Sequence, residues 1–482
     1  MGGASGAGGG GGGNGGSGGG ALGGAFRYGI NTGFFTAKVA DADSAALAVK
    51  AGANSMRAKL SEQHLTTWGD EIEVNDMKAY QALGMTDLVA FLGGPIAEHS
   101  TAPPGKAPWE LEFYSPKNLY EPIFLPNGEV NPDNHWASFV ARVAKTYGPW
   151  LKMYEIWNEP DQVGGNWQAT LAWDKEPPKP ADLLWWNDTI FAYVRMLRIA
   201  HEVIPKYDPD GLVALGGIGY PSFLGAILRY TDEPTSGAVS GDFPQKGGAY
   251  FDVVSYHYYP VFSPGNSDVG AEGLLKLKGE LEAKLAGAQV SGKSWVVTES
   301  GAPRQSFDGK PGGESYARNY LLKLMTLGQG AGLLGIDWYL LGDGKKVGSS
   351  QDPFEFMGLY LNYSDAQGKD DAQITPTGVA YATIGKLLGG ALADPAGTGA
   401  LALPPGVSGG AFQTKDGKRA FVLWARDGQS EGAKASYKLP LDQPVAVHAW
   451  DHSATGSAEK RSPEGGGIPL ELTSAPVIVV EQ

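Results

Sequence analysis

The feature that most constrains this fold is a regular alternation of short apolar segments with longer amphipathic ones between residues 25 and 390. Eight short segments are strand candidates: 27–33, 54–59, 86–92, 152–158, 212–218, 251–257, 294–299 and 333–339. The clearest helical patterns lie between them, at 134–147, 182–204, 270–286, 314–328 and 376–388. Strands that alternate with helices form parallel sheets. Eight such units predict an α/β fold of the (β/α)8 TIM-barrel type, with long loops.

The alternative is an open doubly wound sheet. That fold usually has a glycine-rich fingerprint in the turn after its first strand. Here the corresponding residues 29–35 are GINTGFF, which lack the fingerprint. The sequence therefore favours the closed barrel.

From about residue 391 the helical patterns give way to short alternating segments. They span residues 409–414, 419–426, 434–439, 444–450, 467–472 and 476–481. Asp416-Gly417, between the first two, is a hairpin signal. Residues 391–482 are thus predicted to form an all-β sandwich domain. A packing partner for the barrel is the favoured role of this domain, and carbohydrate binding is the alternative.

Residues 1–24 contain 16 glycines and almost nothing that can form a core. Such a segment is typical of a flexible glycine- and serine-rich linker. A tether of this kind often follows a removed export signal, so we expect a secreted or surface-anchored protein. A cloning linker and a disordered cytosolic tail are the alternatives.

Composition excludes several classes of function. A net charge of −14 argues against a nucleic-acid partner, which needs a basic face. Without cysteine the chain has neither disulfides nor cysteine-based zinc sites, and its seven histidines show no HExxH spacing. No metal or cofactor is therefore predicted. The sequence contains no run of about 18 apolar residues, so no membrane-spanning helix is predicted. The oligomeric state is left open.

Two strands end abruptly at a glutamate: YEIWNEPD at 154–161 contains Glu159, and WVVTESG at 295–301 contains Glu299. In a barrel, both carboxylates would reach the C-terminal rim, where active sites are built. Two facing carboxyls are the apparatus of glycoside hydrolysis, since one protonates the leaving oxygen and the other attacks or stabilises the anomeric carbon. We assign Glu159 as general acid/base and Glu299 as nucleophile. Asn158 is placed to hydrogen-bond a sugar hydroxyl beside the reacting carbon.

Asn-Glu-Pro closing one strand and Thr-Glu-Ser-Gly closing a later one resemble the clan A glycoside hydrolases. Those enzymes are barrels with the acid/base after strand four and the nucleophile after strand seven, and Glu159 and Glu299 end the fourth and seventh predicted strands. The longer string YEIWNEPD is most similar to family 39, which usually carries a β-sandwich beside the barrel. The resemblance implies a retaining O-glycoside hydrolase that acts on β-linked glycosides or polysaccharides by double displacement.

Further positions match the clan. His257 and Tyr259 lie two apart at the end of strand six, hence on one face. In related enzymes such a tyrosine hydrogen-bonds the nucleophile, while the histidine touches the sugar or the acid/base. The resemblance also implies that Trp338 forms an aromatic floor under the reacting sugar, and that Arg57 lies near the nucleophile. A structural pair, a core tryptophan and an arginine that pairs with an acid inside the barrel are the alternatives.

Two acids of the first motif are predicted to be structural. Glu155 lies four residues before Glu159, too deep to share its substrate, and is expected to pair with Arg57 or Lys59. Asp161 is expected to be a loop or capping residue. Aromatic side chains crowd the two long loops at 94–133 and 160–181 and are candidate sugar platforms: Trp109, Phe113, Tyr114, Tyr120, Trp167 and Trp173.

Two other functions remain open. A non-catalytic polysaccharide-binding protein would keep the aromatic residues, and a transglycosylase would use the same carboxyls to transfer sugars to other sugars. The partner is in each case an oligosaccharide or polysaccharide, whose sugar and linkage the motifs do not identify. Few basic residues are expected near the pocket, namely Arg57, Lys59 and Arg304, which favours a neutral sugar over a uronic acid.

Overall fold

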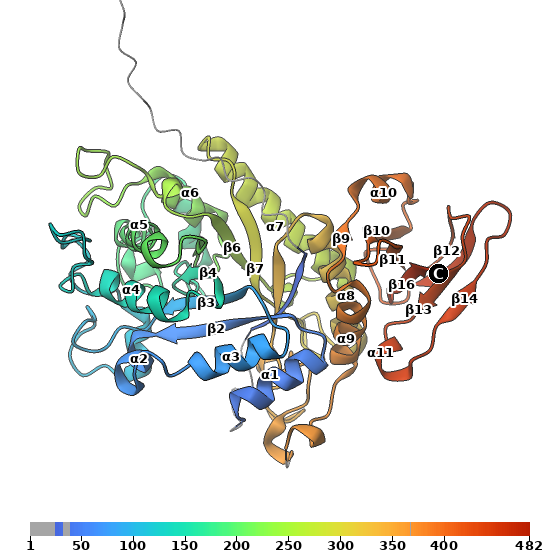
Figure 1. Ribbon diagram of the computed structural model, residues 1–482. Helices are drawn as coiled ribbons and strands as arrows, with labels where there is room; N and C mark the ends of the chain where they lie inside the picture. The colour runs from blue at the N-terminus through green and yellow to red at the C-terminus, as the bar shows by residue number, and fades with distance from the viewer. Residues whose placement is uncertain (1–24, 32–38, 367) are drawn as a thin grey trace, which may run out of the picture.

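The structure is a computed structural model that describes residues 25–31, 39–366 and 368–482. The predicted linker, 1–24, and the end of the first predicted strand lie outside these residues. Eight parallel strands close into a barrel in chain order, which confirms the predicted TIM barrel (Figure 1). The strands are β1 (Arg27–Asn31), β2 (Ser55–Ser61), β3 (Leu88–Gly93), β4 (Leu151–Ile156), β5 (Leu212–Leu215), β6 (Val253–Tyr258), β7 (Ser294–Ser300) and β8 (Gly335–Tyr339).

Helices surround the barrel between successive strands. They are α1 (Asp41–Lys50), α2 (Glu62–Trp68), α3 (Val74–Ala82), α4 (His135–Tyr147), α5 (Ile190–Tyr207), α6 (Pro221–Arg229), α7 (Ser267–Gly287), α8 (Glu314–Gly330) and α9 (Pro376–Leu388). Four of the five predicted helices agree closely, but the one predicted at 182–204 begins eight residues later. The Thr189 hydroxyl accepts a hydrogen bond from the Ala192 N–H and caps the helix there. Leu183 and Trp186 are buried under the preceding loop, so their apolar character belongs to loop packing.

The barrel interior changes from apolar to polar along its axis. A plug of small and branched side chains fills the N-terminal part: Val89, Met153, Ala214, Val253 and Val296. Above this plug, toward the C-terminal ends of the strands, lie charged and polar side chains that include Arg57, Glu155 and Thr298. Strand β2 points to the left of Figure 1, so the barrel opens its C-terminal end on that side. The plug closes the other end, which leaves one face for a site.

The C-terminal domain is antiparallel and has two sheets, as predicted. A six-stranded sheet has the order β14-β13-β16-β11-β10-β9, and β12 pairs with β15. The strands are β9 (Leu392–Ala393), β10 (Val407–Gln413), β11 (Arg419–Ala425), β12 (Lys434–Leu439), β13 (Val445–His448), β14 (Glu459–Arg461), β15 (Ile468–Thr473) and β16 (Val477–Glu481). Short helices α10 (Pro395–Ala400) and α11 (His452–Thr455) connect them. A separate apolar core lies between the two sheets, and β10 and β11 form the hairpin expected at Asp416-Gly417.

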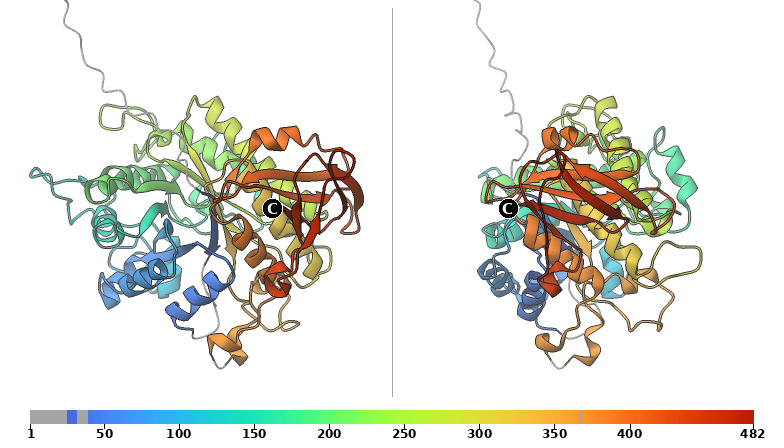
Figure 2. Two further views of the ribbon diagram at one scale, coloured as in Figure 1. Left: turned by 45° about the vertical axis from the view of Figure 1, so that its right-hand side comes forward. Right: turned by 90° about the vertical axis from the view of Figure 1, so that its right-hand side faces the viewer.

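This domain packs on α8 and α9, away from the open end of the barrel (Figures 1 and 2). Phe412, Val422 and Trp424 belong to the same continuous core as the barrel helices. The Trp424 indole donates a hydrogen bond to Asp268 at 2.9 Å. Glu431 accepts one from the Ser267 N–H at 2.7 Å, at the first residue of α7. A side chain of the C-terminal domain thus caps a helix of the barrel.

Within the described residues, no helix combines the length and the apolar character needed to cross a bilayer.

Candidate active site

The ends of β4 and β5 hold Glu159 in an unusual backbone conformation. Trp157 and Glu159 have positive φ angles, 72° and 45°, which residues other than glycine rarely adopt. The Glu159 N–H donates to the Gly216 carbonyl at 2.6 Å, and the Trp157 indole donates to the Trp185 carbonyl at 2.8 Å. Strained backbone of this kind persists where its surroundings over-determine it, and it clusters at functional sites.

A bulge in β7 positions Glu299. Tyr256 on β6 pairs with Val297, but the next residue, His257, pairs with Glu299. The extra residue is Thr298, whose hydroxyl hydrogen-bonds with Glu155 inside the barrel at 2.6 Å. Because a bulge changes the direction of the side chain that follows it, Thr298 and Glu299 both reach the barrel interior.

Two donors hold the Glu299 carboxylate. The Arg57 guanidinium donates to one oxygen at 2.7 Å and the Tyr259 hydroxyl to the other at 2.7 Å. Burial alone would raise the pKa of Glu299. The positive charges of His257 and Arg57 and the hydrogen bond from Tyr259 outweigh it and hold that pKa below its usual 4.5. Glu299 is therefore built to stay ionised.

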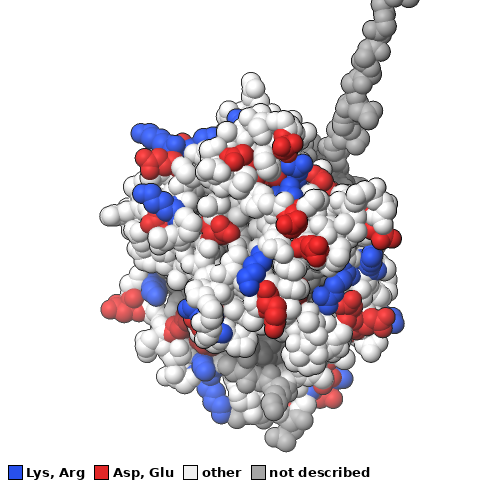
Figure 3. Space-filling model, turned by 90° about the vertical axis from the view of Figure 1, so that its left-hand side faces the viewer, with Lys and Arg blue, Asp and Glu red and all other residues white. Residues whose placement is uncertain are grey.

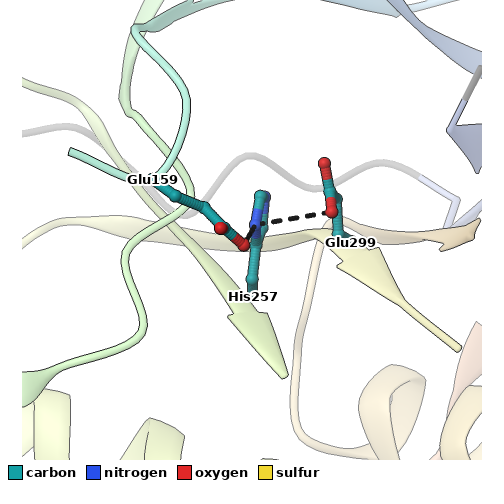
Figure 4. Close-up of side chains that lie close together, drawn as sticks. All are labelled: Glu159, His257 and Glu299. Carbon is teal, nitrogen blue, oxygen red and sulfur yellow. Dashed lines mark hydrogen bonds and ion pairs between the residues drawn. The ribbon is translucent and has the colours of Figure 1, made fainter. Parts of the chain in front are cut away.

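His257 lies between the two glutamates (Figure 4). Its Nδ1 is 2.7 Å from Glu159 and 3.7 Å from Glu299, and its Nε2 is 3.0 Å from the Thr298 hydroxyl. Burial would lower the pKa of His257, but the negative charge of Glu299 and the contact with Glu159 raise it above 6.5. One oxygen of each glutamate and Nδ1 or Nε2 of His257 all lie within 4.8 Å of one another.

A metal ion could also bridge ligand atoms at this spacing. However, the donors from Arg57 and Tyr259 already occupy both oxygens of Glu299. A positive guanidinium bound to a carboxylate competes with a cation for it. The donor set thus favours a hydrogen-bonded pair of carboxyls over a metal centre.

Below this pair, Arg57 links three side chains. Its Nε donates to Glu155 at 2.6 Å, and its second terminal nitrogen donates to the Asn158 amide oxygen at 2.7 Å. Glu155 is completely buried and also accepts from Ser255 at 2.7 Å. The expected buried pair of Glu155 is thus with Arg57, whereas Lys59 pairs with another acid. Arg57 combines the structural role and the site role that sequence reasoning treated as alternatives.

Asp161 lies on the loop side of the site and is buried. Its carboxylate accepts from the backbone N–H groups of Gly219 and Tyr220, at 2.8 and 2.7 Å. It thereby ties the loop after β4 to the loop after β5. This agrees with the expected capping role.

The prediction that Trp338 floors the sugar site is wrong. Trp338 is completely buried, its indole donates to the Met357 carbonyl at 2.8 Å, and its ring packs near Tyr320 of α8. It therefore faces the helix layer. Successive side chains of a strand point to opposite faces, so the next residue, Tyr339, faces the site instead. The Tyr339 ring lies 5.8 Å from the ring of Tyr259, edge to face.

The predicted aromatic platforms divide into four groups. Trp173 is buried against Phe223, so its ring is not accessible to a sugar. Tyr120 packs its ring against the Arg195 guanidinium at 5.7 Å. Trp109 and Trp167 are more than half exposed. Phe113 and Tyr114 are half-buried.

A cavity of about 190 Å³ adjoins Asn158 at the C-terminal ends of β2, β3 and β4. Its lining includes Lys59, Phe91, Glu112, Phe113, Asn158 and Trp185. Sequence reasoning missed Phe91, Glu112 and Trp185 as site residues. Phe91 could have been predicted, because it pairs with Lys59 in the β2–β3 register. Residues that pair on neighbouring strands point to the same face of the sheet. Glu112 and Trp185 lie in loops that no strand pattern places.

The open end of the barrel carries acidic and basic side chains in mixture, with no basic patch on the described part of the face that Figure 3 shows. The basic residues named near the site are all paired. Arg57 binds two glutamates, Lys59 binds Glu112, and Arg304 binds Asp343 and Glu314. No unpaired cation of this set is available for an acidic sugar.

Replacing Tyr259 with phenylalanine tests whether the Tyr259 hydroxyl keeps Glu299 ionised. Any reaction that depends on ionised Glu299 should lose about tenfold to a hundredfold in kcat/KM, because the variant removes a hydrogen bond to an ionised group. Tyr259 stabilises the charged form of Glu299, so its removal raises the pKa of that carboxyl. Activity that needs ionised Glu299 is lost as pH falls through this pKa. The acidic limb of the pH–rate profile should therefore move to higher pH.

The neighbouring Tyr258→Phe variant is the control, because the Tyr258 side chain lies against α7 at Gly273. It should leave both the rate and the acidic limb unchanged. An unchanged limb in Tyr259→Phe would show that this hydroxyl does not tune Glu299.

No family model and no curated protein matches the sequence. Among solved structures, the chain is similar to a family 39 glycoside hydrolase from Bacteroides cellulosilyticus WH2, with a TM-score of 0.61 and 16% identity over 94% of this chain and 80% of that one. It is also similar to a family 30 endoxylanase from Clostridium papyrosolvens C71, with a TM-score of 0.55 and 14% identity over 95% and 97% of the two chains.

A third similar structure is a monomeric β-xylosidase from Caulobacter crescentus CB15, with a TM-score of 0.51 and 14% identity over 95% of both chains. At these identities the likeness shows the fold. The chain thus shares the barrel-plus-sheet architecture of clan A glycoside hydrolases.

Proposed function

We propose that this chain is a retaining glycoside hydrolase for β-linked glycosides, with Glu159 as general acid/base and Glu299 as nucleophile. The observation that carries the proposal is the approach of the two carboxyls to within 4.8 Å. Retaining enzymes hold them about 5–5.5 Å apart, whereas inverting enzymes leave about 6.5–9.5 Å for a water molecule. This spacing therefore supports retention rather than inversion.

The environments of the two glutamates support the division of roles. Glu299 receives the hydrogen bonds of Arg57 and Tyr259, which suits an ionised nucleophile. Among the described residues, no lysine or arginine contacts Glu159, whose hydrogen-bond neighbours are His257 and Gln162 at 2.7 and 3.3 Å. Glu159 thus has no permanently charged partner of the kind that Glu299 has in Arg57, and this difference supports its assignment as general acid/base.

In the first step, Glu299 attacks the anomeric carbon while Glu159 donates its proton to the departing oxygen. In the second, Glu159 removes a proton from water, which attacks the glycosyl-enzyme and frees Glu299. An acceptor sugar in place of water gives transglycosylation by the same residues. A binding protein without turnover would need neither the close approach of two carboxyls nor an arginine that keeps one of them charged.

The stereochemistry of the first product tests the mechanism. Aryl β-glycosides and polysaccharides are screened first, and the fastest substrate is then hydrolysed inside an NMR tube. The β-anomer is expected to appear before mutarotation. An initial α-anomer would contradict retention, and the absence of any product across a broad panel would favour a binding protein.

Replacing Glu159 with glutamine separates the two roles. For substrates with a poor leaving group, kcat/KM is expected to fall by roughly 10²–10⁴-fold, the usual contribution of general acid–base catalysis. A dinitrophenyl glycoside leaves without protonation, so its first step should be nearly normal and a burst of dinitrophenol should precede slow turnover. Equal losses for both leaving groups would contradict the assignment. Glu202→Gln, on α5, is the control. Gln162→Glu is unsuitable for this purpose, because Gln162 contacts Glu159.

A further inference from the structure

The cavity beside Asn158 contains an ion pair that the proposed chemistry does not use. The Lys59 ammonium lies 2.5 Å from one oxygen of Glu112, and each side chain is about one-third exposed, 32% and 35%. Exposed pairs of this kind contribute little to stability. Lys59 comes from the end of β2 and Glu112 from the 3-10 helix Pro108–Phe113, so the pair joins the barrel rim to the long loop after β3.

The pair presents a donor and an acceptor side by side. An ammonium has three donor hydrogens, and the ion pair engages one of them. A carboxylate has two oxygens, of which Lys59 binds Oε1 of Glu112. Neighbouring hydroxyls on a sugar ring need this combination, because each hydroxyl both donates and accepts.

The walls of the cavity are aromatic. The rings of Phe113 and Trp185 are nearly parallel, with centroids 6.4 Å apart and planes at 11°. Phe91 also lines the cavity, with the Arg57 guanidinium 4.4 Å from its ring centre. Flat apolar faces beside a few convergent polar groups suit the C–H faces and hydroxyls of a sugar. At about 190 Å³ the cavity is smaller than the roughly 300–1,000 Å³ of sites for drug-sized ligands, so it fits one sugar unit.

Asn158 connects this cavity to the reacting centre. Its amide oxygen accepts from Arg57, which also donates to Glu299, so Asn158 and the nucleophile are held by one guanidinium. A hydroxyl next to the anomeric carbon would meet Asn158. The hydroxyls further around the ring would then enter the cavity.

We infer that this cavity binds the sugar unit that the enzyme transfers, and that Lys59 and Glu112 select a neutral sugar through two adjacent hydroxyls. The transfer rests on the proposed function, whereas the binding of a monosaccharide does not. Glu112 neutralises Lys59, which disfavours a uronic acid.

Calorimetric titration of the whole chain with xylose, glucose, galactose and glucuronic acid tests the inference without turnover. At least one neutral sugar is expected to bind. Lys59→Met and Glu112→Gln should each weaken that binding by about tenfold or more, since each removes a charged hydrogen-bond partner. Both variants should unfold at the wild-type denaturant concentration, because the pair is exposed.

Lys106 and Glu110 provide the matched control. They form an ion pair of 2.7 Å on the same loop, outside the cavity lining. Lys106→Met and Glu110→Gln should leave sugar binding unchanged. The inference is overturned if no neutral sugar binds, if glucuronic acid binds most tightly, or if Lys59→Met binds like the wild type. A failure of the proposed function would appear separately, as normal hydrolysis by Glu159→Gln.

Discussion

Replacing Glu299 with alanine is expected to reduce turnover by roughly four to six orders of magnitude, on the scale seen when the nucleophile of a hydrolase is removed. The loss should be the same for poor and good leaving groups, because the first covalent bond can no longer form. Circular dichroism and the denaturation midpoint should be close to those of the wild type. Glu272→Gln, a glutamate that pairs with Arg426 at the domain boundary, is the control for surface charge.

Azide distinguishes the roles of the two glutamates by stereochemistry. In Glu299→Ala it can occupy the space of the missing carboxylate and attack an activated aryl β-glycoside directly, which gives an α-glycosyl azide. In Glu159→Ala the nucleophile remains, so azide attacks the glycosyl-enzyme and gives a β-glycosyl azide. NMR of the isolated azides identifies the anomer. The opposite pairing of products would exchange the two assignments, and normal hydrolysis by Glu299→Ala would overturn the mechanism.

Replacing Arg57 with methionine is expected to be the most destabilising single change in the site. Arg57 is 1% exposed and Glu155 is fully buried, so the variant leaves a charge in the barrel without its partner. The removal of one member of a buried pair costs about 3–5 kcal/mol. Chemical denaturation measures this as a shift of the midpoint. Unfolding at the wild-type midpoint would contradict the proposed role of Arg57 as the counter-charge of Glu155.

A second substitution separates stability from chemistry. In Arg57→Met/Glu155→Gln the buried charge is absent, so much of the lost stability should return. Glu299 still lacks its guanidinium, so its pKa should stay above the wild-type value and the acidic limb of the pH–rate profile should stay at higher pH. Recovery of both properties together would mean that Arg57 acts on Glu299 only through Glu155.

The sequence predicted the barrel because hydrophobic periodicity reports burial, and eight strand segments alternate with helices. It also placed Glu159 and Glu299 on one rim, because parallel strands end at the same edge. The contacts of His257 and Tyr259 with these glutamates follow from the same argument, since the two residues end the strand beside β7.

Other features escaped prediction because they depend on a single step of register or on loop packing. Trp338 and Tyr339 differ by one residue, and a shift of one residue reverses the face of a strand. The bulge at Thr298 has no signal in the string WVVTE. Trp173 looked like a platform because an exposed and a buried aromatic residue in a loop have the same sequence pattern. Glu112 meets Lys59 only through the path of a long loop.

The continuous core between the barrel and the sheet domain bears on how the molecule unfolds. Residue 390 separates two architectures, yet Trp424 and Glu431 of the second hold the start of α7 in the first. Glu431 also accepts from the Asn319 amide of α8 at 2.6 Å. Cleavage at the boundary would leave these polar groups without partners and an apolar flank of α8 in water. We therefore expect the two parts to unfold as one cooperative unit. We also expect the sheet domain to restrict the motion of α7 and α8, the helices beside β7, the strand that carries Glu299.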